Sequence, residues 1–277
     1  MSNFFDRFSL SGKKSLVTGA SKGIGEVIAK VLAEAGSDLV IVGRDKHDLQ
    51  KTQEFVKKLG RDCLIISSDL SQKEGPEKVA RKALDYYGTI DVLINNAGVT
   101  LLDSVLSTDI EDWEKVLATN LSAPFMIAKN LAPKMIEQRS GKIVNISSLA
   151  SEYALENHIA YSVSKSGLNM MTKAMTAEWT RYNIQVNSVC PTVVMTSMGE
   201  LAWGDPEKSA PMLAKIPIGR FGQPSEIADL VLFLSSNASD FICGQSIFID
   251  GGFSAVSYTH LRAHETEADL VCRLLLE

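Results

Sequence analysis

The stretch TGASKGIG, residues 18–25, decides the fold. It follows a short apolar run, KSLVT (14–18), and precedes a helical pattern that ends at Gly36. The three glycines of the stretch would let backbone N–H groups approach a pyrophosphate at the start of that helix. The spacing is G-x-x-x-G-x-G rather than the more familiar G-x-G-x-x-G, and a plain tight turn is the alternative. The strand before it and the helix after it favour a nucleotide site.

Further short runs, mostly apolar and rich in β-branched residues, predict buried parallel strands along the chain. Longer stretches with a 3.6-residue apolar spacing alternate with them, which is typical of βαβ units with right-handed crossovers. We therefore expect an α/β fold with helices on both faces of the sheet. The predicted strands are 14–18, 38–42, 62–66, 91–94, 142–146, 184–188 and 246–249, and the predicted helices are 24–36, 46–59, 73–87, 110–131, 160–181 and 225–234.

The segment from about 193 to 217 interrupts this alternation of strands and helices. It contains two glycines and three prolines among apolar residues. A long insertion of this kind in a compact domain is usually functional and often closes over a site. We therefore expect this segment to be a lid over the substrate.

Composition narrows the function classes. The 277 residues carry a net charge of −5, which gives no electrostatic support to a nucleic-acid partner. The start of the chain lacks the apolar core of a secretory signal, and no run of about 18 apolar residues predicts a membrane span. No CxxC pair occurs, so neither a metal site nor a disulfide framework is expected. A cytoplasmic location is the default expectation.

The end of the second predicted strand indicates which nucleotide is bound. A carboxylate there would bind a ribose 2′-hydroxyl and repel a 2′-phosphate, but Gly43 holds that position and Arg44 follows it. A guanidinium can pair bidentately with phosphate, and Lys22 in the glycine turn can reach the same group. These residues favour NADP(H) over NAD(H). Two solvated surface cations are the alternative, and the nearby Asp45 weakens the charge argument.

Two other loops that follow predicted strands could meet the nucleotide. Asp69, after the third strand, could accept a hydrogen bond from an adenine amino group, or simply cap a helix. The small and amide residues of NNAG (95–98) would let the loop after the fourth strand lie flat against a ligand. Alone, that motif would be a turn.

Tyr161 and Lys165, in YSVSK, are four residues apart and share one face of a predicted helix. An ammonium beside a phenol stabilises the phenolate, so we expect a lowered pKa for Tyr161 and a role as general acid or base. Ser147 could offer its hydroxyl to a carbonyl oxygen, and Asn120 could hold a water or a backbone kink behind the lysine. By itself, Y-x-x-x-K is more often a surface pair.

These motifs have the order and spacing found in the short-chain dehydrogenase/reductase family, which the chain resembles over about residues 10–256. The resemblance implies a single domain (1–256) with a Rossmann-like, doubly wound, seven-stranded parallel sheet of order 3-2-1-4-5-6-7. It also implies a homotetramer formed through the helices 110–131 and 160–181 and the last strand. The implied catalytic tetrad is Asn120, Ser147, Tyr161 and Lys165.

In that tetrad, the resemblance implies that Tyr161 donates the proton and that Ser147 polarises the carbonyl. Lys165 would lower the pKa of the tyrosine and hold the nicotinamide ribose, while Asn120 would support a proton-relay water. The residues expected to bind the cofactor are Gly19, Ser21, Lys22, Gly23, Ile24, Gly25, Arg44, Asp69, Asn95, Ala97, Gly98, Tyr161, Lys165, Pro191, Val194 and Thr196.

The runs 191–221 and 156–161 are similar to the NADPH-dependent dicarbonyl/L-xylulose reductase branch of this family, the carbonyl reductases. Most family members have Pro-Gly after the sixth strand, whereas this chain has Thr192, which could donate its hydroxyl locally in the turn. By this resemblance, Ser147, His158 and Trp203 would contact the substrate. A helix-cap imidazole and a lid-packing indole are the alternatives for His158 and Trp203.

The implied function is NADPH-dependent reduction of small carbonyl compounds, namely α-dicarbonyls and ketoses such as L-xylulose. A 3-oxoacyl thioester, a gluconate-type sugar acid or a specialised-metabolite ketone are alternative substrates within the family. A nucleotide-binding scaffold is the alternative outside the enzymes, and the complete tetrad argues against it. Residues 257–277 extend past the usual end of the family and resemble translated adapter sequence, so we expect a non-native addition, with an amphipathic extension as the alternative.

Overall fold

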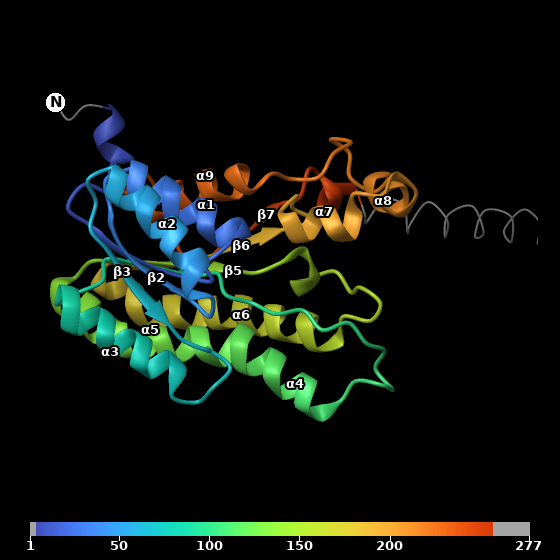
Figure 1. Cartoon of the computed structure of the whole chain (residues 1–277), viewed down its shortest axis with the longest axis horizontal. Helices are drawn as coiled ribbons and strands as arrows, with labels where there is room; N and C mark the ends of the chain where they lie inside the picture. Colours follow the sequence, from blue (N-terminus) through green and yellow to red (C-terminus); the bar gives the residue numbers. More distant parts are fainter. Residues whose placement is uncertain (1–3, 257–277) are drawn as a thin grey trace, which may run out of the picture.

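The computed structural model describes residues 4–256, so the predicted non-native extension 257–277 lies outside the described residues. Within this part of the chain, parallel strands form one seven-stranded sheet of order β3-β2-β1-β4-β5-β6-β7 (Figure 1). The implied doubly wound α/β sheet is therefore confirmed. The strands are β1 (Lys14–Thr18), β2 (Asp38–Gly43), β3 (Cys63–Ser67), β4 (Val92–Asn95), β5 (Gly141–Ile146), β6 (Ile184–Pro191) and β7 (Ser246–Ile249).

Helices cover both faces of the sheet, with α1, α2 and α9 on one face and α3, α5 and α6 on the other (Figure 1). An apolar core fills the space between each layer and the sheet. Successive residues of a strand contribute to the cores on opposite faces of the sheet, because side chains alternate across a strand. Val17 lies in the core under α1 and α9, and Leu16 lies in the core under α3, α5 and α6. No helix within residues 4–256 has the length and apolar character to cross a membrane.

The α-helices are α1 (Gly23–Glu34), α2 (Lys46–Lys58), α3 (Gly75–Tyr87), α4 (Ile110–Leu117), α5 (Ala123–Gln138), α6 (Ile159–Trp179), α7 (Ser197–Trp203), α8 (Pro206–Leu213) and α9 (Pro224–Ser235). Shorter helical turns are η1 (Phe4–Arg7), η2 (Ala118–Ser122), η3 (Leu149–Ser151), η4 (Thr180–Tyr182) and η5 (Asn237–Ser239).

Two predicted segments differ in detail from the structure. In place of the predicted helix 110–131, the structure has α4, the π-helical turn η2 and α5, which continues to Gln138. Asn120 lies in η2, and its amide both accepts from the Val99 N–H (2.8 Å) and donates to the Val99 carbonyl (2.9 Å). A π turn held by a distant loop leaves no mark in the apolar spacing of the helix. The predicted lid, 193–217, contains the short helices α7 and α8.

The strand order reverses between β1 and β4, which opens a crevice at the carboxyl ends of these strands. Asn96, directly after β4, ties the two loops there together. Its side-chain amide donates to the carbonyls of Thr18 (2.9 Å) and Gly19 (3.2 Å). In return, the Thr18 hydroxyl accepts from the backbone N–H groups of Asn96 and Ala97, both at 3.0 Å. The glycine turn and the NNAG loop therefore form one unit.

This unit leaves no room for a side chain on Gly25. A Cβ there would lie 2.3 Å from both the Gly19 carbonyl oxygen and the Asn96 Nδ2 atom. We expect Gly25→Ala to lower the free energy of unfolding by about 1–3 kcal/mol, because the overlap is with backbone that no rotamer change can relieve. Urea unfolding measures the loss.

The matched control is Gly222→Ala, whose Cβ would come no nearer than 3.6 Å to another atom. This control should unfold at the midpoint of the unsubstituted protein. Equal midpoints for Gly25→Ala and Gly222→Ala would contradict the prediction.

Candidate active site

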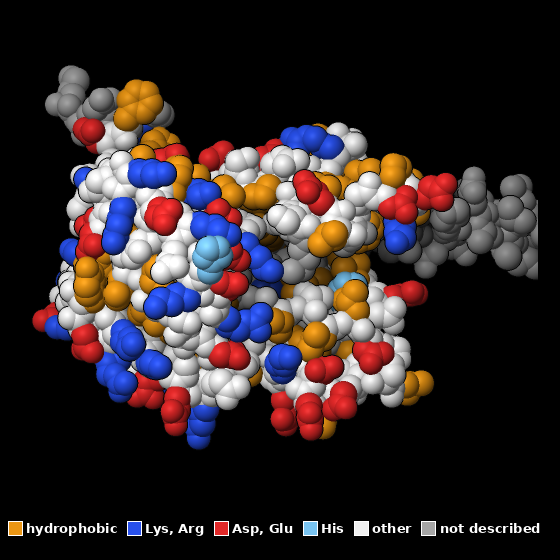
Figure 2. All heavy atoms as spheres, in the orientation of Figure 1, with side chains coloured by type: hydrophobic (Ala, Val, Ile, Leu, Met, Phe, Trp, Pro, Cys, Tyr) orange, Lys and Arg blue, Asp and Glu red, His pale blue; other side chains and the backbone are white. Residues whose placement is uncertain are grey.

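A cavity of about 470 Å³ opens at the carboxyl ends of β1 to β4. Figure 2 shows the hollow beside the part of the surface that carries α7 and α8. Its volume lies in the range of small-molecule and cofactor sites. The predicted cofactor residues that line it are Gly19, Ser21, Lys22, Gly23, Ile24, Gly25, Arg44, Asp69, Ala97, Gly98 and Thr196.

The other predicted cofactor residues lie outside the lining of this cavity. Asn95 is buried within the sheet, where its amide donates to the Asn145 Oδ1 atom at 2.8 Å. Pro191 ends β6, and Val194 forms an isolated bridge with Gly222 at the base of the lid segment. Tyr161 and Lys165 belong to the neighbouring tetrad, described below.

Several lining residues were missed by reasoning from the sequence. They come from the loops after β3 and β4, from the region around α4 and η2, and from α7. Lys115 and Thr119 fall within a helical pattern that showed only an apolar face, so no sequence signal marked them. The missed residues are Ser68, Leu70, Ser71, Val99, Lys115, Thr119, Ser197 and Leu201. Asn96, which the NNAG motif had included, and Gly43, which had been noted only because it stands where a carboxylate was expected, also line the cavity.

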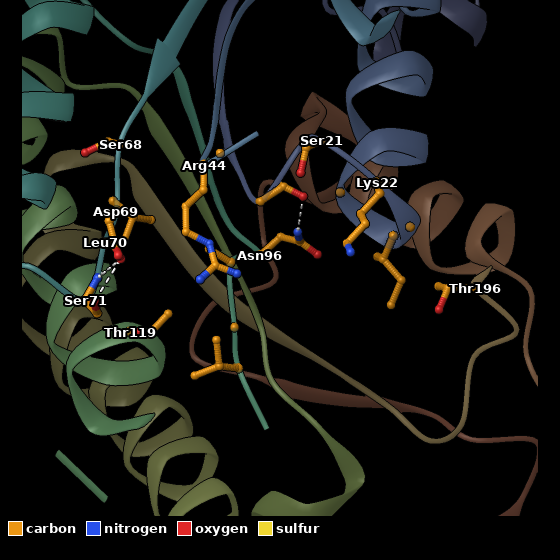
Figure 3. Close-up of a pocket in the computed structure, with 18 of the residues that line it drawn as sticks. Ser21, Lys22, Arg44, Ser68, Asp69, Leu70, Ser71, Asn96, Thr119 and Thr196 are labelled. Carbon is orange, nitrogen blue, oxygen red and sulfur yellow. Dashed lines mark hydrogen bonds between the residues drawn. The ribbon is translucent and has the colours of Figure 1, made fainter. Parts of the chain in front are cut away.

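Positive charge dominates the cavity wall. In Figure 3 the side chains of Arg44 and Lys22 point into the same space, with Arg44 between Asp69 and Asn96. Within residues 4–256 neither cation has a carboxylate at ion-pair distance. The Asp45 carboxylate instead caps α2 by accepting from two backbone N–H groups at 2.9 and 3.1 Å. The cavity therefore offers cations to a ligand that brings its own negative charge.

Asp69 is the carboxylate on this wall. It accepts from the Ser71 backbone N–H (2.9 Å) and from the Ser71 hydroxyl (2.8 Å). The backbone bond, followed by the hydroxyl bond and the charges of Arg44 and Lys115, holds the Asp69 pKa below its usual value. Asp69 is therefore an ionised acceptor at the edge of the cavity.

The four predicted tetrad residues come together from three segments of the chain. Tyr161 and Lys165 lie on α6, and the Lys165 Nζ atom is 5.6 Å from the centroid of the tyrosine ring. Lys165 also donates to the Ile146 carbonyl at the end of β5 (2.7 Å). The Ser147 hydroxyl donates to the Lys165 carbonyl (3.2 Å). Asn120 reaches the same helix through the Ser164 hydroxyl, to which its amide donates at 3.1 Å.

Burial controls protonation in the tetrad. Burial raises the pKa of Tyr161, and hydrogen bonds with Ser148 and Thr100 only partly oppose it. The expected lowered pKa of Tyr161 is therefore wrong for this structure, because burial outweighs the stabilisation of the phenolate by the Lys165 ammonium, which donates to the Ile146 carbonyl and lies over the ring face. Burial also lowers the Lys165 pKa to about 8. Tyr161 consequently keeps its proton at neutral pH.

The cavity and the tetrad meet at Gly98. A Cβ at this position would lie 3.4 Å from the Asn120 Oδ1 atom and 3.6 Å from the Lys165 Nζ atom. Because Gly98 has no side chain, the cavity wall stays thin at the lysine. A ligand that extends from Arg44 past the glycine turn would thus end beside Tyr161. This shape and charge suit a phosphorylated dinucleotide.

The segment 193–217, predicted to be a lid, is hydrogen-bonded at its start to Gly222, and its residue Leu201 lies at the cavity. The Met195 N–H donates to the Gly222 carbonyl (2.8 Å), and the Gly222 N–H donates to the Val193 carbonyl (3.0 Å). The Thr196 hydroxyl then caps α7 by accepting from the Gly199 N–H (3.1 Å). On α7, Leu201 lines the cavity although it is 90% exposed.

Besides Ser147, the structure places the other two predicted substrate residues, His158 and Trp203, differently from each other. The His158 ring lies edge-on to Tyr161, with 6.3 Å between centroids, and its Nδ1 atom is 2.5 Å from the Glu156 carbonyl oxygen. Because a carbonyl only accepts, Nδ1 carries the hydrogen and Nε2 is an acceptor in the neutral ring. Trp203 instead packs 5.9 Å from the Phe221 ring in an apolar cluster, which agrees with the lid-packing alternative.

Thr192 follows β6 at the same edge of the sheet. Its hydroxyl oxygen is buried and has no hydrogen-bond partner within residues 4–256. The local hydrogen bond expected in the turn is therefore not formed.

Comparison with known proteins agrees with this geometry. A family model described as enoyl-(acyl carrier protein) reductase matches residues 19–254. L-xylulose reductase of Bos taurus is 40% identical over 250 residues, which cover 89% of this chain and 98% of that protein. NAD-dependent glycerol dehydrogenase of Listeria innocua is 38% identical over 251 residues, which cover 90% and 97%.

Solved structures share the whole fold. A gluconate 5-dehydrogenase from Burkholderia cenocepacia, in complex with NADP and tartrate, is 33% identical and superposes with a TM-score of 0.86, covering 91% of this chain and 99% of that one. Matches of this extent, on a sheet with this strand order, show the family directly. The chain belongs to the short-chain dehydrogenase/reductase family and is an oxidoreductase that acts on alcohol and ketone groups.

Proposed function

We propose that the protein is an NADPH-dependent reductase of small carbonyl compounds, with α-dicarbonyls and ketoses such as L-xylulose as substrates. The observation that carries the cofactor choice is the pair of cations, Arg44 and Lys22, on the cavity wall where β2 ends in Gly43. A carboxylate at that strand end would repel a 2′-phosphate, whereas these cations attract it. The 40% identity to L-xylulose reductase supports the substrate class.

The cofactor would extend along the cavity from Arg44 to the tetrad. Arg44 and Lys22 would hold the 2′-phosphate, and ionised Asp69 would accept from the adenine amino group. The glycine turn would present backbone N–H groups to the pyrophosphate. Lys165 would hold the nicotinamide ribose, with Gly98 leaving room for it. When bound, NADPH supplies the hydride that reduces the carbonyl carbon.

The tetrad supplies the proton and stabilises the charge that develops on the carbonyl oxygen. Tyr161, which keeps its proton because burial raises its pKa, donates that proton to the oxygen. Ser147 donates a hydrogen bond to the same oxygen, for which its hydroxyl turns away from the Lys165 carbonyl. The Lys165 ammonium against the ring then stabilises the phenolate that remains. Asn120, bonded to Val99 and Ser164, supports a water that returns a proton.

The environment of His158 supports a hydroxylated substrate. Its Nε2 atom is an acceptor beside Tyr161, since the Glu156 carbonyl fixes the hydrogen on Nδ1. A hydroxyl next to the reacting carbonyl of a ketose can donate to this atom. A 3-oxoacyl thioester and an α-dicarbonyl have no hydroxyl at that place, so this contact favours the ketoses within the proposed substrate class.

We expect Tyr161→Phe to lower kcat by about 10²–10⁴-fold, because the general acid is lost. NADPH should bind as before, since phenylalanine keeps the ring against which Lys165 lies. NADPH oxidation is followed with an α-dicarbonyl, L-xylulose, a keto sugar acid and a 3-oxoacyl thioester, and binding is followed by NADPH fluorescence. Undiminished turnover by the variant would refute the mechanism, and turnover of only the last two compounds would refute the substrate class.

Arg44→Ala should raise the KM for NADPH by about 10–100-fold, the value of a lost hydrogen bond to a charged group, with little effect on the KM for NADH. The matched control is Lys46→Ala, a neighbouring exposed cation of α2 that does not line the cavity. Steady-state kinetics with both nucleotides gives the comparison. An equal rise for the two nucleotides would remove the 2′-phosphate argument.

Lys165→Met should change stability in a pH-dependent way. Because burial lowers the Lys165 pKa from 10.5 to about 8, the charged lysine costs the folded state about 3 kcal/mol below pH 8. That cost disappears as pH rises from 8 toward 10.5. The variant, which loses activity, should therefore gain most in Tm relative to the unsubstituted protein below pH 8, and this gain should shrink at higher pH. A Tm difference independent of pH would contradict the prediction.

A further inference from the structure

Buried and partly buried polar contacts join one face of α6 to the ends of β5 and β6. Tyr161, Lys165 and Asn169 occupy successive turns of this face, because four residues are slightly more than one helical turn. Lys165 meets the last residue of β5 through the Ile146 carbonyl. Asn169 lies one turn further along and meets the helical turn η3 after β5, together with the end of β6.

The contacts of Asn169 lead to the catalytic serine by two routes. Its amide donates to the Ser151 hydroxyl at 2.8 Å, and that hydroxyl donates to the Ser148 carbonyl at 2.6 Å. The same amide lies 3.6 Å from the Cys190 Sγ atom, and the thiol lies 3.8 Å from the Asn169 Oδ1 atom. Cys190 directly follows Val189, whose carbonyl accepts from the Ser147 N–H at 2.7 Å, and the Ser151 hydroxyl lies 4.0 Å from the Cys190 Sγ atom.

Ser147 and Cys190 are closed off from solvent, whereas Asn169 and Ser151 are partly exposed. Cys190 has no exposed surface and Ser147 is 3% exposed. Burial raises the pKa of the Cys190 thiol, so it stays neutral and acts as a weak hydrogen-bonding group between Asn169 and Ser151. The backbone on which Ser147 lies is thereby held at Ser148, the next residue, and at Val189, the strand partner of its N–H.

We infer that Asn169, acting through Cys190 and Ser151, is a positioning residue for the Ser147 hydroxyl. The inference rests on the proposed function in that Ser147 polarises the substrate carbonyl. The backbone of Ser147 is fixed by the hydrogen bond from its N–H to the Val189 carbonyl (2.7 Å). Its hydroxyl, by contrast, can donate either to the Lys165 carbonyl or to the substrate. Asn169 holds the turn Ser148–Ser151, whose position determines where the Ser147 hydroxyl lies. This position matters because catalysis is sensitive to displacements of about 1 Å.

The test compares Asn169→Leu, which keeps the size of the side chain and removes its hydrogen bonds, with Thr176→Val. Thr176 lies on the same helix, and its hydroxyl donates only to the backbone carbonyls of Thr172 (2.9 Å) and Val186 (3.2 Å). We expect Asn169→Leu to lower kcat by about 10-fold or more, with an unchanged Kd for NADPH, because the cofactor cavity does not include Asn169. Thr176→Val should leave kcat unchanged.

A double-mutant cycle with Ser147→Ala separates positioning from a general structural role. If Asn169 acts through Ser147, then Asn169→Leu should lower kcat no further once the serine hydroxyl is gone. Equal losses in both backgrounds would overturn the inference. Where Asn169→Leu does not fold, Cys190→Ala takes its place in the same cycle with the same expectation.

A crystal structure of the folded variant gives a readout that needs no substrate. We expect the Ser147 hydroxyl and the turn from Ser148 to Ser151 to move away from the Lys165 carbonyl, while the glycine turn stays in place. An unmoved Ser147 would overturn the inference. Because this readout is independent of turnover, it remains valid even if the carbonyl panel refutes the proposed substrates.

Discussion

The close contact between the glycine turn and the loop after β4 is the constraint on which the site depends. Asn96 donates to the carbonyls of Thr18 and Gly19, and Gly25 lies so near them that no Cβ fits. This contact brings the start of α1 against the end of β4 at the point where the strand order reverses. The cavity, its cations and the approach to Lys165 all take their positions from it.

At the tetrad, stability and reactivity oppose each other. An ammonium that is 4% exposed and a partly buried phenol are both costly to charge, as the lowered Lys165 pKa and the raised Tyr161 pKa indicate. The Ile146 carbonyl compensates the lysine in part. This environment keeps Tyr161 protonated at neutral pH, as the proposed reduction requires. The contacts of Asn169 with Ser151 and Cys190 are the ones that we infer to position Ser147, the third member of the group.

Much of the fold could be predicted from local patterns. Strand β1, for example, has the predicted bounds, because a buried apolar run that leads into glycines has few other solutions. The predicted helix through Asn120 was wrong in detail, since a contact with Val99, 21 residues away along the chain, sets the π turn. Lys115 and Thr119 were not predicted as cavity residues for a related reason. Their helical pattern shows which face is apolar, but it does not show which loop lies opposite the other face.

The sequence by itself determined the class of fold, the glycine turn with Lys22, the shared helix face of Tyr161 and Lys165, and the position of Arg44 at the end of β2. These features depend on residue type and spacing along one element, which the sequence contains. Only the tertiary structure decided the direction of the Tyr161 pKa, the packing of Trp203 on Phe221 and the contacts of Asn169 with Ser151 and Cys190. The physical reason is that burial and long-range hydrogen bonds arise between segments, and spacing within one segment carries no information about the other.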